Sequence, residues 1–285
     1  MKECLFGLPD FRTEREDVRQ FLVRKYKELA KRAGFDGVRI DAMKHFDSKL
    51  VIELRKEFTK INTDMIFIGE YWGSAPDEKW MSVFSEYNVD FLFDFEFRDY
   101  LSGFLRGVMR PEVFVSYLNR RYNFAEKGFI VFLNNHDMDG LITHFDDINE
   151  KDEGNLLRIM ALMQFVSGGA PLIYYGEENG IRVGKGIENR RDMQFSERVM
   201  GLRSFYKRLV SLKKKGMLSG KFSAKYENGL LIINIGNMYG EIKAIVNRDR
   251  NEKEFQINGN YIKVPSLDCL LIKSDSGGME YLIPH

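Results

Sequence analysis

The 285-residue sequence is 44% hydrophobic and 13% aromatic, which is enough to bury a large core and excludes a disordered chain. Its 43 basic and 42 acidic side chains give a formal charge of +1, so the chain has no net field to gather nucleic acid or an anionic membrane, and we expect a neutral partner. No stretch reaches the roughly 18 apolar residues of a membrane span. Two cysteines, Cys4 and Cys269, are too few for a disulfide framework and favour a reducing, cytoplasmic location.

The first 216 residues alternate between helical and strand patterns. A capping-box pattern at Thr13 and Glu16 predicts a helix that ends at Gly34, and Asp47 or Ser48 opens a second helix. Further helices are predicted over residues 111–122 and 155–166, and strands over residues 38–40, 65–68, 89–93, 129–133 and 171–175. This order is typical of a parallel sheet with crossover helices.

The last 70 or so residues have a different texture. After a long predicted helix over residues 197–215, short apolar runs follow at residues 230–234, 242–246, 261–264 and 270–272. Asn228-Gly229 and Asn258-Gly259 are hairpin turn signals between such runs. We therefore predict a separate small antiparallel β domain from residue 217 to residue 285.

The parallel part is too short for a closed barrel. Such a barrel needs eight strands and typically about 250 residues, whereas about five strands are predicted before residue 217. An open sheet of these strands would expose raw edges and half of a core. We expect that upstream strands are missing from this sequence or that another chain supplies them.

Three apolar runs each stop at a carboxylate, namely Asp41, Glu70 and Asp137. The carboxyl ends of barrel strands open onto one face, so these three side chains can converge on one pocket. Arg39 lies two residues before Asp41 on the same strand face, where its charge would hold Asp41 ionised. Glu70 has no basic neighbour in the sequence, which suits a group that acts as an acid.

Three motifs resemble those of one enzyme family. Residues 34–45 (Gly-Phe-Asp-Gly-Val-Arg-Ile-Asp-Ala-Met-Lys-His) resemble the fourth-strand motif of the α-amylase family of glycoside hydrolases, residues 69–72 (Gly-Glu-Tyr-Trp) the fifth-strand motif, and residues 132–137 (Phe-Leu-Asn-Asn-His-Asp) the seventh-strand motif. Weaker matches lie at residues 8–10, 169–178 and 191–195. The resemblance implies the carboxy-terminal part of such an enzyme: an α/β fold in which residues 1–216 form a partial TIM (β/α)8 barrel, strands four to eight without about the first three, and residues 217–285 a small antiparallel β-sandwich domain.

The resemblance also implies a role for each matched residue. Asp41 becomes the nucleophile, Glu70 the general acid/base, and Asp137 the third carboxylate, which binds and distorts the sugar. Substrate contacts are implied for five more side chains: Arg39, Lys44, His45, Trp72 and His136. Trp72 has an equal claim to be a packing residue, because a tryptophan after a strand is more often part of a core.

Other charged and aromatic residues receive ordinary structural interpretations. We expect Tyr174 and Tyr175 in the core of a buried strand, and Glu177 and Glu178 as loop or helix-entry charges. Asp146-Asp147 and Asp152-Glu153 are interpreted as exposed loop charges and not as a cation site, and no metal ligand is predicted. The resemblance implies calcium, whose ligands would come largely from a third-strand motif that nothing in residues 1–35 resembles. Gly140 also departs from the family, since many members place Arg there.

We therefore expect a retaining enzyme that acts on α-1,4 bonds of α-glucans or maltooligosaccharides, by hydrolysis or by transglycosylation. The alternative is a non-catalytic glucan-binding or assembly subunit, or an inactive truncated remnant that needs a partner chain. A third hypothesis, an accessory subunit of a membrane transporter, is weaker, because such subunits need an upstream membrane helix and usually lack the acid/base.

Overall fold

A computed structural model describes residues 9–73, 77–122, 128–145, 148–182, 184–275 and 278–283. The chain divides into two compact units, of which the first comprises Met1–Phe95 and Glu126–Ile130 and the second Glu96–Ala125 and Val131–His285. Among the described residues, no helix is long and apolar enough to cross a membrane. Cys269 is a free thiol, and Cys4 lies outside the described residues.

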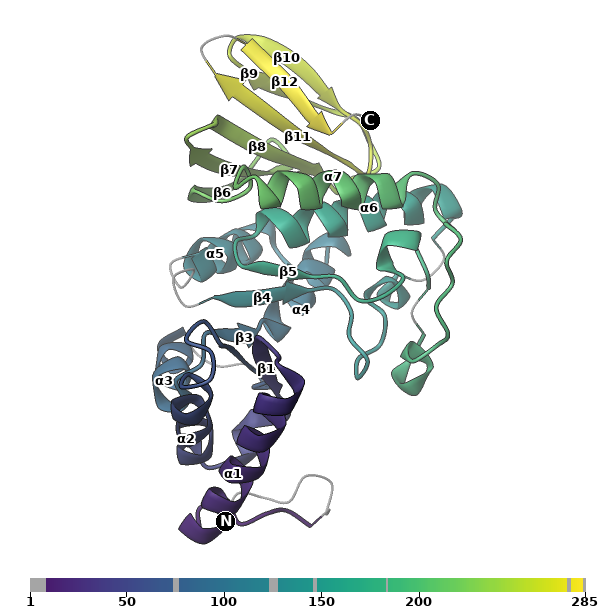
Figure 1. The fold of residues 1–285 in the computed structure, drawn as a ribbon. Helices are drawn as coiled ribbons and strands as arrows, with labels where there is room; N and C mark the ends of the chain where they lie inside the picture. The colour runs from purple at the N-terminus through teal and green to yellow at the C-terminus, as the bar shows by residue number, and fades with distance from the viewer. Residues whose placement is uncertain are drawn as a thin grey trace. The chain divides into compact units, whose positions relative to one another are not determined.

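The first unit is a parallel sheet accompanied by helices (Figure 1). β1 pairs with β2 from Gly37 opposite Ile66 onward, β3 continues the sheet beside β2, and Phe129 and Ile130 of β4 pair with β3. α1 lies beside α2, and α2 beside α3. The elements that begin in this unit are α1 (Glu16–Ala33), β1 (Gly37–Ile40), η2 (Met43–His45), α2 (Ser48–Phe58), β2 (Ile66–Gly69), α3 (Asp77–Tyr87), β3 (Phe91–Phe93), α4 (Phe95–Leu105) and β4 (Phe129–Phe132).

Local signals explain most of these boundaries. Gly34 ends α1 in the left-handed conformation (φ 63°), and the Asp47 side chain accepts a hydrogen bond from the Lys49 N–H at the start of α2. The predicted capping box is wrong, because α1 has no side-chain cap and the Thr13 hydroxyl accepts from the Asp47 N–H instead (3.0 Å). Thr13 thus ties the segment before α1 to the start of α2.

As far as the structure describes it, the second unit contains the end of β4, its neighbour β5, four α-helices, three 3₁₀ helices and the antiparallel strands. Apart from α4 and β4, its helical elements are α5 (Pro111–Tyr122), η4 (Leu141–His144), α6 (Glu150–Val166), η5 (Glu177–Asn179), η6 (Gly186–Asn189) and α7 (Leu202–Lys214). Its further strands are β5 (Ala170–Leu172), β6 (Lys221–Glu227), β7 (Leu230–Asn237), β8 (Gly240–Asn247), β9 (Lys253–Ile257), β10 (Asn260–Val264), β11 (Asp268–Asp275) and β12 (Gly278–Ile283).

The antiparallel strands form a five-stranded sheet, in the order β12-β11-β8-β7-β6, and the separate hairpin β9-β10. Alternate residues of β7 enter two different cores. Leu230 and Ile232 pack with the hairpin, whereas Leu231 and Ile233 join the cluster formed with the helices. Because both faces of the sheet are buried, the sequence of β7 is a nearly continuous apolar run. The predicted turns at Asn228-Gly229 and Asn258-Gly259 are confirmed, with positive φ at all four residues.

An asparagine joins α5 to the edge strand β6. The Asn119 amide donates to the Ala224 carbonyl (2.9 Å) and accepts from the Ala224 N–H (2.8 Å). Ala224 is buried, so both of its backbone groups need such partners. One side chain therefore supplies the two hydrogen bonds that a neighbouring strand would supply.

Two predicted helices begin at other residues than expected. α6 begins at Glu150 and not at residue 155, because Asn149 caps it by accepting from the Asp152 N–H (2.9 Å). α7 begins at Leu202 and not at residue 197, because Gly201 takes the left-handed conformation (φ 80°). The Glu197 carboxylate then accepts from the Arg203 N–H at the start of α7 (2.7 Å).

Candidate active site

In the first unit, Arg39 joins the carboxylates that follow β1 and β2. Its guanidinium donates to Asp41 through Nη1 (2.6 Å) and to Glu70 through Nη2 (2.5 Å). Burial lowers the Arg39 pKa, but Glu70 and Asp41 together raise it above its usual value. Glu70 has no basic neighbour in the sequence, and its basic partner comes from the adjacent strand.

The backbone beyond β1 is shaped to meet Glu70. Ala42 takes the left-handed conformation (φ 46°), which is uncommon for a residue other than glycine, and its N–H donates to Glu70 Oε2 (3.0 Å). The Met43 N–H donates to the Glu70 carbonyl (2.9 Å). Glu70 is therefore fixed and buried (7% exposed), whereas the Asp41 side chain is 71% exposed.

Three predicted site residues follow the two carboxylates closely in the sequence: Lys44 and His45 after Asp41, and Trp72 after Glu70. Lys44 Nζ donates to the Trp72 carbonyl (2.9 Å), and His45 belongs to the short helix η2. The Trp72 ring stacks on Phe95 with ring centroids 4.9 Å apart, yet Trp72 is 41% exposed. One face of the indole thus packs on a neighbour, and the exposed part leaves room for a flat ligand.

In the second unit, Asp137 has two basic partners. Arg190 Nη2 donates to Asp137 Oδ1 (2.7 Å), and His136 Nε2 lies 3.0 Å from Asp137 Oδ2. Arg190 also donates to the His136 carbonyl through Nε (3.1 Å). Arg190 was not predicted as a site residue, because it comes 53 residues after Asp137 and only its neighbour Arg191 belongs to a recognised pattern.

Two tyrosines hold the loop that carries Arg190. The hydroxyls of Tyr174 and Tyr175 donate to the Asn189 carbonyl (2.8 and 3.3 Å), and Tyr175 also donates to the Arg191 carbonyl (2.5 Å). The prediction that both tyrosines belong to a buried strand is wrong: β5 ends at Leu172, and Tyr175 is 41% exposed. Each phenol instead uses its polar end on a backbone carbonyl.

Glu177 is the first residue of η5, the helix-entry position that was one of its two predicted places. It is only 5% exposed, so it is no surface charge, and it accepts from Asn134 Nδ2 (2.6 Å). Burial raises the pKa of Glu177 to about 8, although the Asn134 hydrogen bond lowers it. Asn134 belongs to the same motif as Asp137, so a buried acid contacts the loop of the predicted third carboxylate.

The described residues hold no cluster of carboxylates of the kind that binds calcium. Among them, no group of three or more His, Cys, Asp or Glu side chains is placed to hold a metal ion. Asp146 and Asp147 lie outside the described residues, and Asp152 accepts from Asn149 Nδ2 (3.0 Å). Glu153 is buried in α6 and paired with Arg182 and Arg198, so its prediction as an exposed loop charge is wrong.

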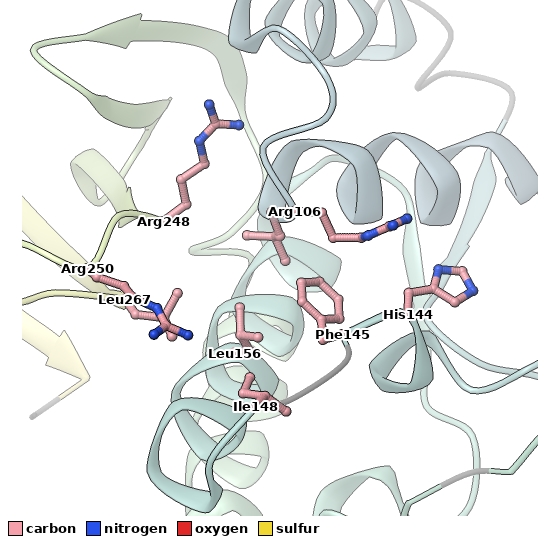
Figure 2. Close-up of a pocket in the computed structure, with 9 residues that line it drawn as sticks. Arg106, His144, Phe145, Ile148, Leu156, Arg248, Arg250 and Leu267 are labelled. Carbon is pink, nitrogen blue, oxygen red and sulfur yellow. The ribbon is translucent and has the colours of Figure 1, made fainter.

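A pocket of about 350 Å³ in the second unit lies among η4, α6 and the segment after β8. Its lining includes Arg106, Arg248 and Arg250 together with His144. Figure 2 shows the three guanidinium groups pointing in different directions, with no shared point between them. Because an anion site needs converging donors, we interpret this pocket as a gap between packed elements. None of the predicted site residues lines it.

Comparisons with known proteins agree with the motifs. Residues 2–200 match the family model of the alpha-amylase catalytic domain. Neopullulanase 2 of Thermoactinomyces vulgaris is 28% identical over 214 residues, covering 73% of this chain and 35% of its own length. A cyclomaltodextrinase of Thermoanaerobacter pseudethanolicus is 22% identical over 292 residues, covering 99% of this chain and 49% of its own length.

The solved structure of an Anoxybacillus alpha-amylase has the same fold, with a TM-score of 0.79 at 24% identity over 98% of this chain and 62% of that one. Parallel strands that alternate with helices define an α/β protein. The chain belongs to the α-amylase family. It spans about a third to a half of the length of the two relatives named above.

Proposed function

We propose that this chain is the carboxy-terminal part of a retaining glycoside hydrolase that acts on α-glucans. Residues 1–216 would contribute strands four to eight of a (β/α)8 barrel, and residues 217–285 an antiparallel β-sandwich domain. The observation that carries the proposal is the pair of carboxylates held on one guanidinium, Asp41 and Glu70 on Arg39. Support comes from relatives that are named neopullulanase, cyclomaltodextrinase and alpha-amylase.

The proposed reaction uses the two carboxylates in turn. Glu70 gives its proton to the leaving oxygen while a carboxylate oxygen of Asp41 bonds to the anomeric carbon and the glycosidic bond breaks. Water then attacks the same carbon, its proton returns to Glu70, and the bond to Asp41 breaks. Because a new alcohol can replace water in the second step, transglycosylation is an alternative outcome.

The exposures of the two carboxylates suit these roles. The exposed Asp41 can approach a sugar, while the buried Glu70 is held by the Ala42 N–H at the base of the site. Asp137 and His136 are proposed to bind hydroxyls of the same sugar, with Lys44, His45 and Trp72 on the leaving-group side. The proposal requires the Asp137 loop to reach the carbon that Asp41 attacks.

A second candidate is a non-catalytic glucan-binding or assembly subunit, or an inactive remnant. About three more parallel strands are proposed to complete the barrel, either from a preceding part of the same polypeptide or from a second chain. Bond specificity for α-1,4 linkages, calcium and a cytoplasmic location stay predictions.

Trapping the covalent intermediate tests the catalytic proposal. The chain is incubated with 5-fluoro-α-D-glucosyl fluoride, and its peptides are analysed by mass spectrometry. We expect a glycosyl adduct on the peptide that contains Asp41, absent in Asp41→Asn and retained in the matched variant Asp36→Asn. An adduct on another carboxylate contradicts the assignment of the nucleophile.

Turnover separates the two candidates. Release of chromophore from a chromogenic maltoside by the isolated chain excludes the non-catalytic alternative. If the chain binds maltooligosaccharides but neither turns them over nor forms an adduct, the second candidate is supported.

A further inference from the structure

Glu177 and Asn134 form a buried contact that the proposed reaction does not use. Glu177 directly follows Gly176, whose left-handed conformation (φ 88°) turns the chain into η5. Its Oε1 accepts from Asn134 Nδ2 at 2.6 Å. Its Oε2 is buried and has no hydrogen-bond partner within the described part of the chain.

Asn134 connects Glu177 to a loop. Its Oδ1 accepts from the Leu141 N–H at 2.7 Å, and Asn134 itself is 8% exposed. The amide therefore joins both ends of the segment from residue 134 to residue 141. That segment carries His136 and Asp137, and inside it the Asp137 N–H donates to Asn135 Oδ1 (3.0 Å).

We propose that Glu177 is a positioning residue, which acts as an uncharged hydrogen-bond acceptor and, through Asn134, fixes the loop of residues 134–141 that presents His136 and Asp137. Glu177 touches neither of these two side chains and would act only through the loop. The proposal rests on the proposed function solely for what Asp137 then does to a sugar.

The geometry favours the neutral form of Glu177. The Asn134 amide and the backbone N–H groups of Tyr174 and Asn134 favour the charged form, but Oε2 has no hydrogen-bond partner in the described part of the chain and the loss of hydration on burial outweighs these donors. The raised pKa of about 8 agrees with this assessment. Glu178, on the same turn, adds a like charge and raises the pKa of Glu177 further.

The electrostatic interaction of Arg98 with Glu177 does not change this conclusion. The buried guanidinium of Arg98 on α4 interacts electrostatically with Glu177, but it already donates to the carbonyls of Leu133 and Asp139. From α7, Tyr206 faces Glu177 with a phenol whose pKa burial raises, so it is uncharged. We therefore expect the loop to be held firmly below pH 8 and to loosen as Glu177 ionises above it.

Two readouts test the proposal without any substrate. The chain has only four histidines, so the ring signals of His136 can be assigned in NMR spectra by single substitutions. Amide hydrogen exchange of residues 134–141 reports how firmly the loop is held. The variants are Glu177→Gln, which keeps a neutral acceptor, Glu177→Leu, which removes it, and the matched neighbour Glu178→Gln.

Below pH 8, we expect Glu177→Gln and Glu178→Gln to match the unmodified protein. In Glu177→Leu, the His136 signals should move, and amides 134–141 should exchange at least about tenfold faster. Exchange in β7 should stay unchanged, which shows that the fold is intact. Unmoved His136 signals in Glu177→Leu, or equal perturbation in Glu177→Gln and Glu177→Leu, overturn the proposal.

A pH titration covers the case in which Glu177→Leu does not fold. Between one unit below and one unit above pH 8, the His136 signals of the unmodified protein should shift in a step that Glu177→Gln lacks. The same step in both proteins overturns the proposal. Failure of the catalytic assignment shows separately, as absence of the Asp41 adduct with the loop response intact.

Discussion

Arg39 is the residue on which the first unit's carboxylates depend. Its two guanidinium nitrogens reach groups that follow different strands, so the arginine links β1 to β2 beyond the sheet hydrogen bonds. A lysine carries one compact charge and cannot make this forked contact. The arginine is therefore both a candidate site residue and a structural one.

We expect Arg39→Met to lower the free energy of unfolding by about 1–3 kcal/mol, because the buried Glu70 loses a charged hydrogen-bond partner. Urea unfolding measures the change. The matched control is Arg15→Met, whose arginine pairs with the exposed Asp17 and should leave the free energy of unfolding nearly unchanged. Equal effects of the two substitutions would show that Glu70 does not need Arg39.

Glu177 gives stability a defined pH dependence. The folded protein keeps the Glu177 proton up to about pH 8, whereas an unfolded chain releases it near 4.5. The stability from this proton is complete below pH 4.5 and is lost as the pH rises toward 8. Relative to Glu177→Gln, the unmodified protein should lose up to about 1.4 kcal/mol per pH unit across this window. Urea midpoints at several pH values measure this, and parallel curves for the two proteins would contradict it.

At the residue scale, the sequence predicted which functional residues follow the strands better than it predicted the contacts that these residues make. Asp41, Glu70 and Asp137 were recognisable because each follows an apolar run, and each lies beyond its strand as expected. Arg190 and the burial of Glu177 were not recognisable, since their contacts span 53 and 43 residues. Such contacts depend on how loops pack, which no local pattern encodes. Whether the three carboxylates meet at one site stays a prediction.

Among the contacts between elements, the amide of Asn119 between α5 and β6 is the most sharply testable. We expect Asn119→Ala to lower the free energy of unfolding by about 1–3 kcal/mol, because the buried N–H and carbonyl of Ala224 both lose their partner. Asn119→Asp keeps the acceptor and loses the donor, so its free energy of unfolding should lie between those of the parent and of Asn119→Ala. Thermal and urea unfolding measure the order, and an Asn119→Ala variant as stable as the parent would contradict it.

At the element scale, the positions of most strands were predicted and several ends were not. Apolar runs locate β1, β2 and β4 to within a residue or so. The starts of α6 and α7 differ because Asn149 caps α6 and the left-handed Gly201 precedes α7, and β5 ends earlier than predicted, at Leu172. An N-cap asparagine and a left-handed glycine look like ordinary loop residues until their partners are known.

For the whole molecule, the structure predicts unequal protection of the two sheets. β1 has half-buried or exposed residues throughout, whereas Ile232 of β7 and Ile245 of β8 are fully buried. We expect amides of β7 and β8 to exchange at least about 100-fold more slowly than those of β1. Hydrogen exchange with mass spectrometry measures this. Comparable rates in β1 and β7 would mean that the chain opens as one cooperative body.

At this scale, the sequence predicted the parallel and antiparallel sheets because their periodicities differ. Helix and strand patterns alternate in the first part, and short runs joined by Asn-Gly turns fill the last part. The division into two compact units that separates residue 95 from residue 96 was not predicted, since contacts and not local composition define it. Strands four to eight of a barrel stay the proposed interpretation of the parallel part.

The position of Asn119 also bears on how this protein behaves at high concentration. β6 is an edge strand of its sheet. An edge strand can pair with the same strand of another molecule, which leads to aggregation. The amide occupies the hydrogen-bonding groups at Ala224, and Lys221 and Lys225 add charge along the same strand. Removing the Asn119 amide would thus leave unpaired hydrogen-bonding groups on this strand, and loss of solubility would accompany loss of stability.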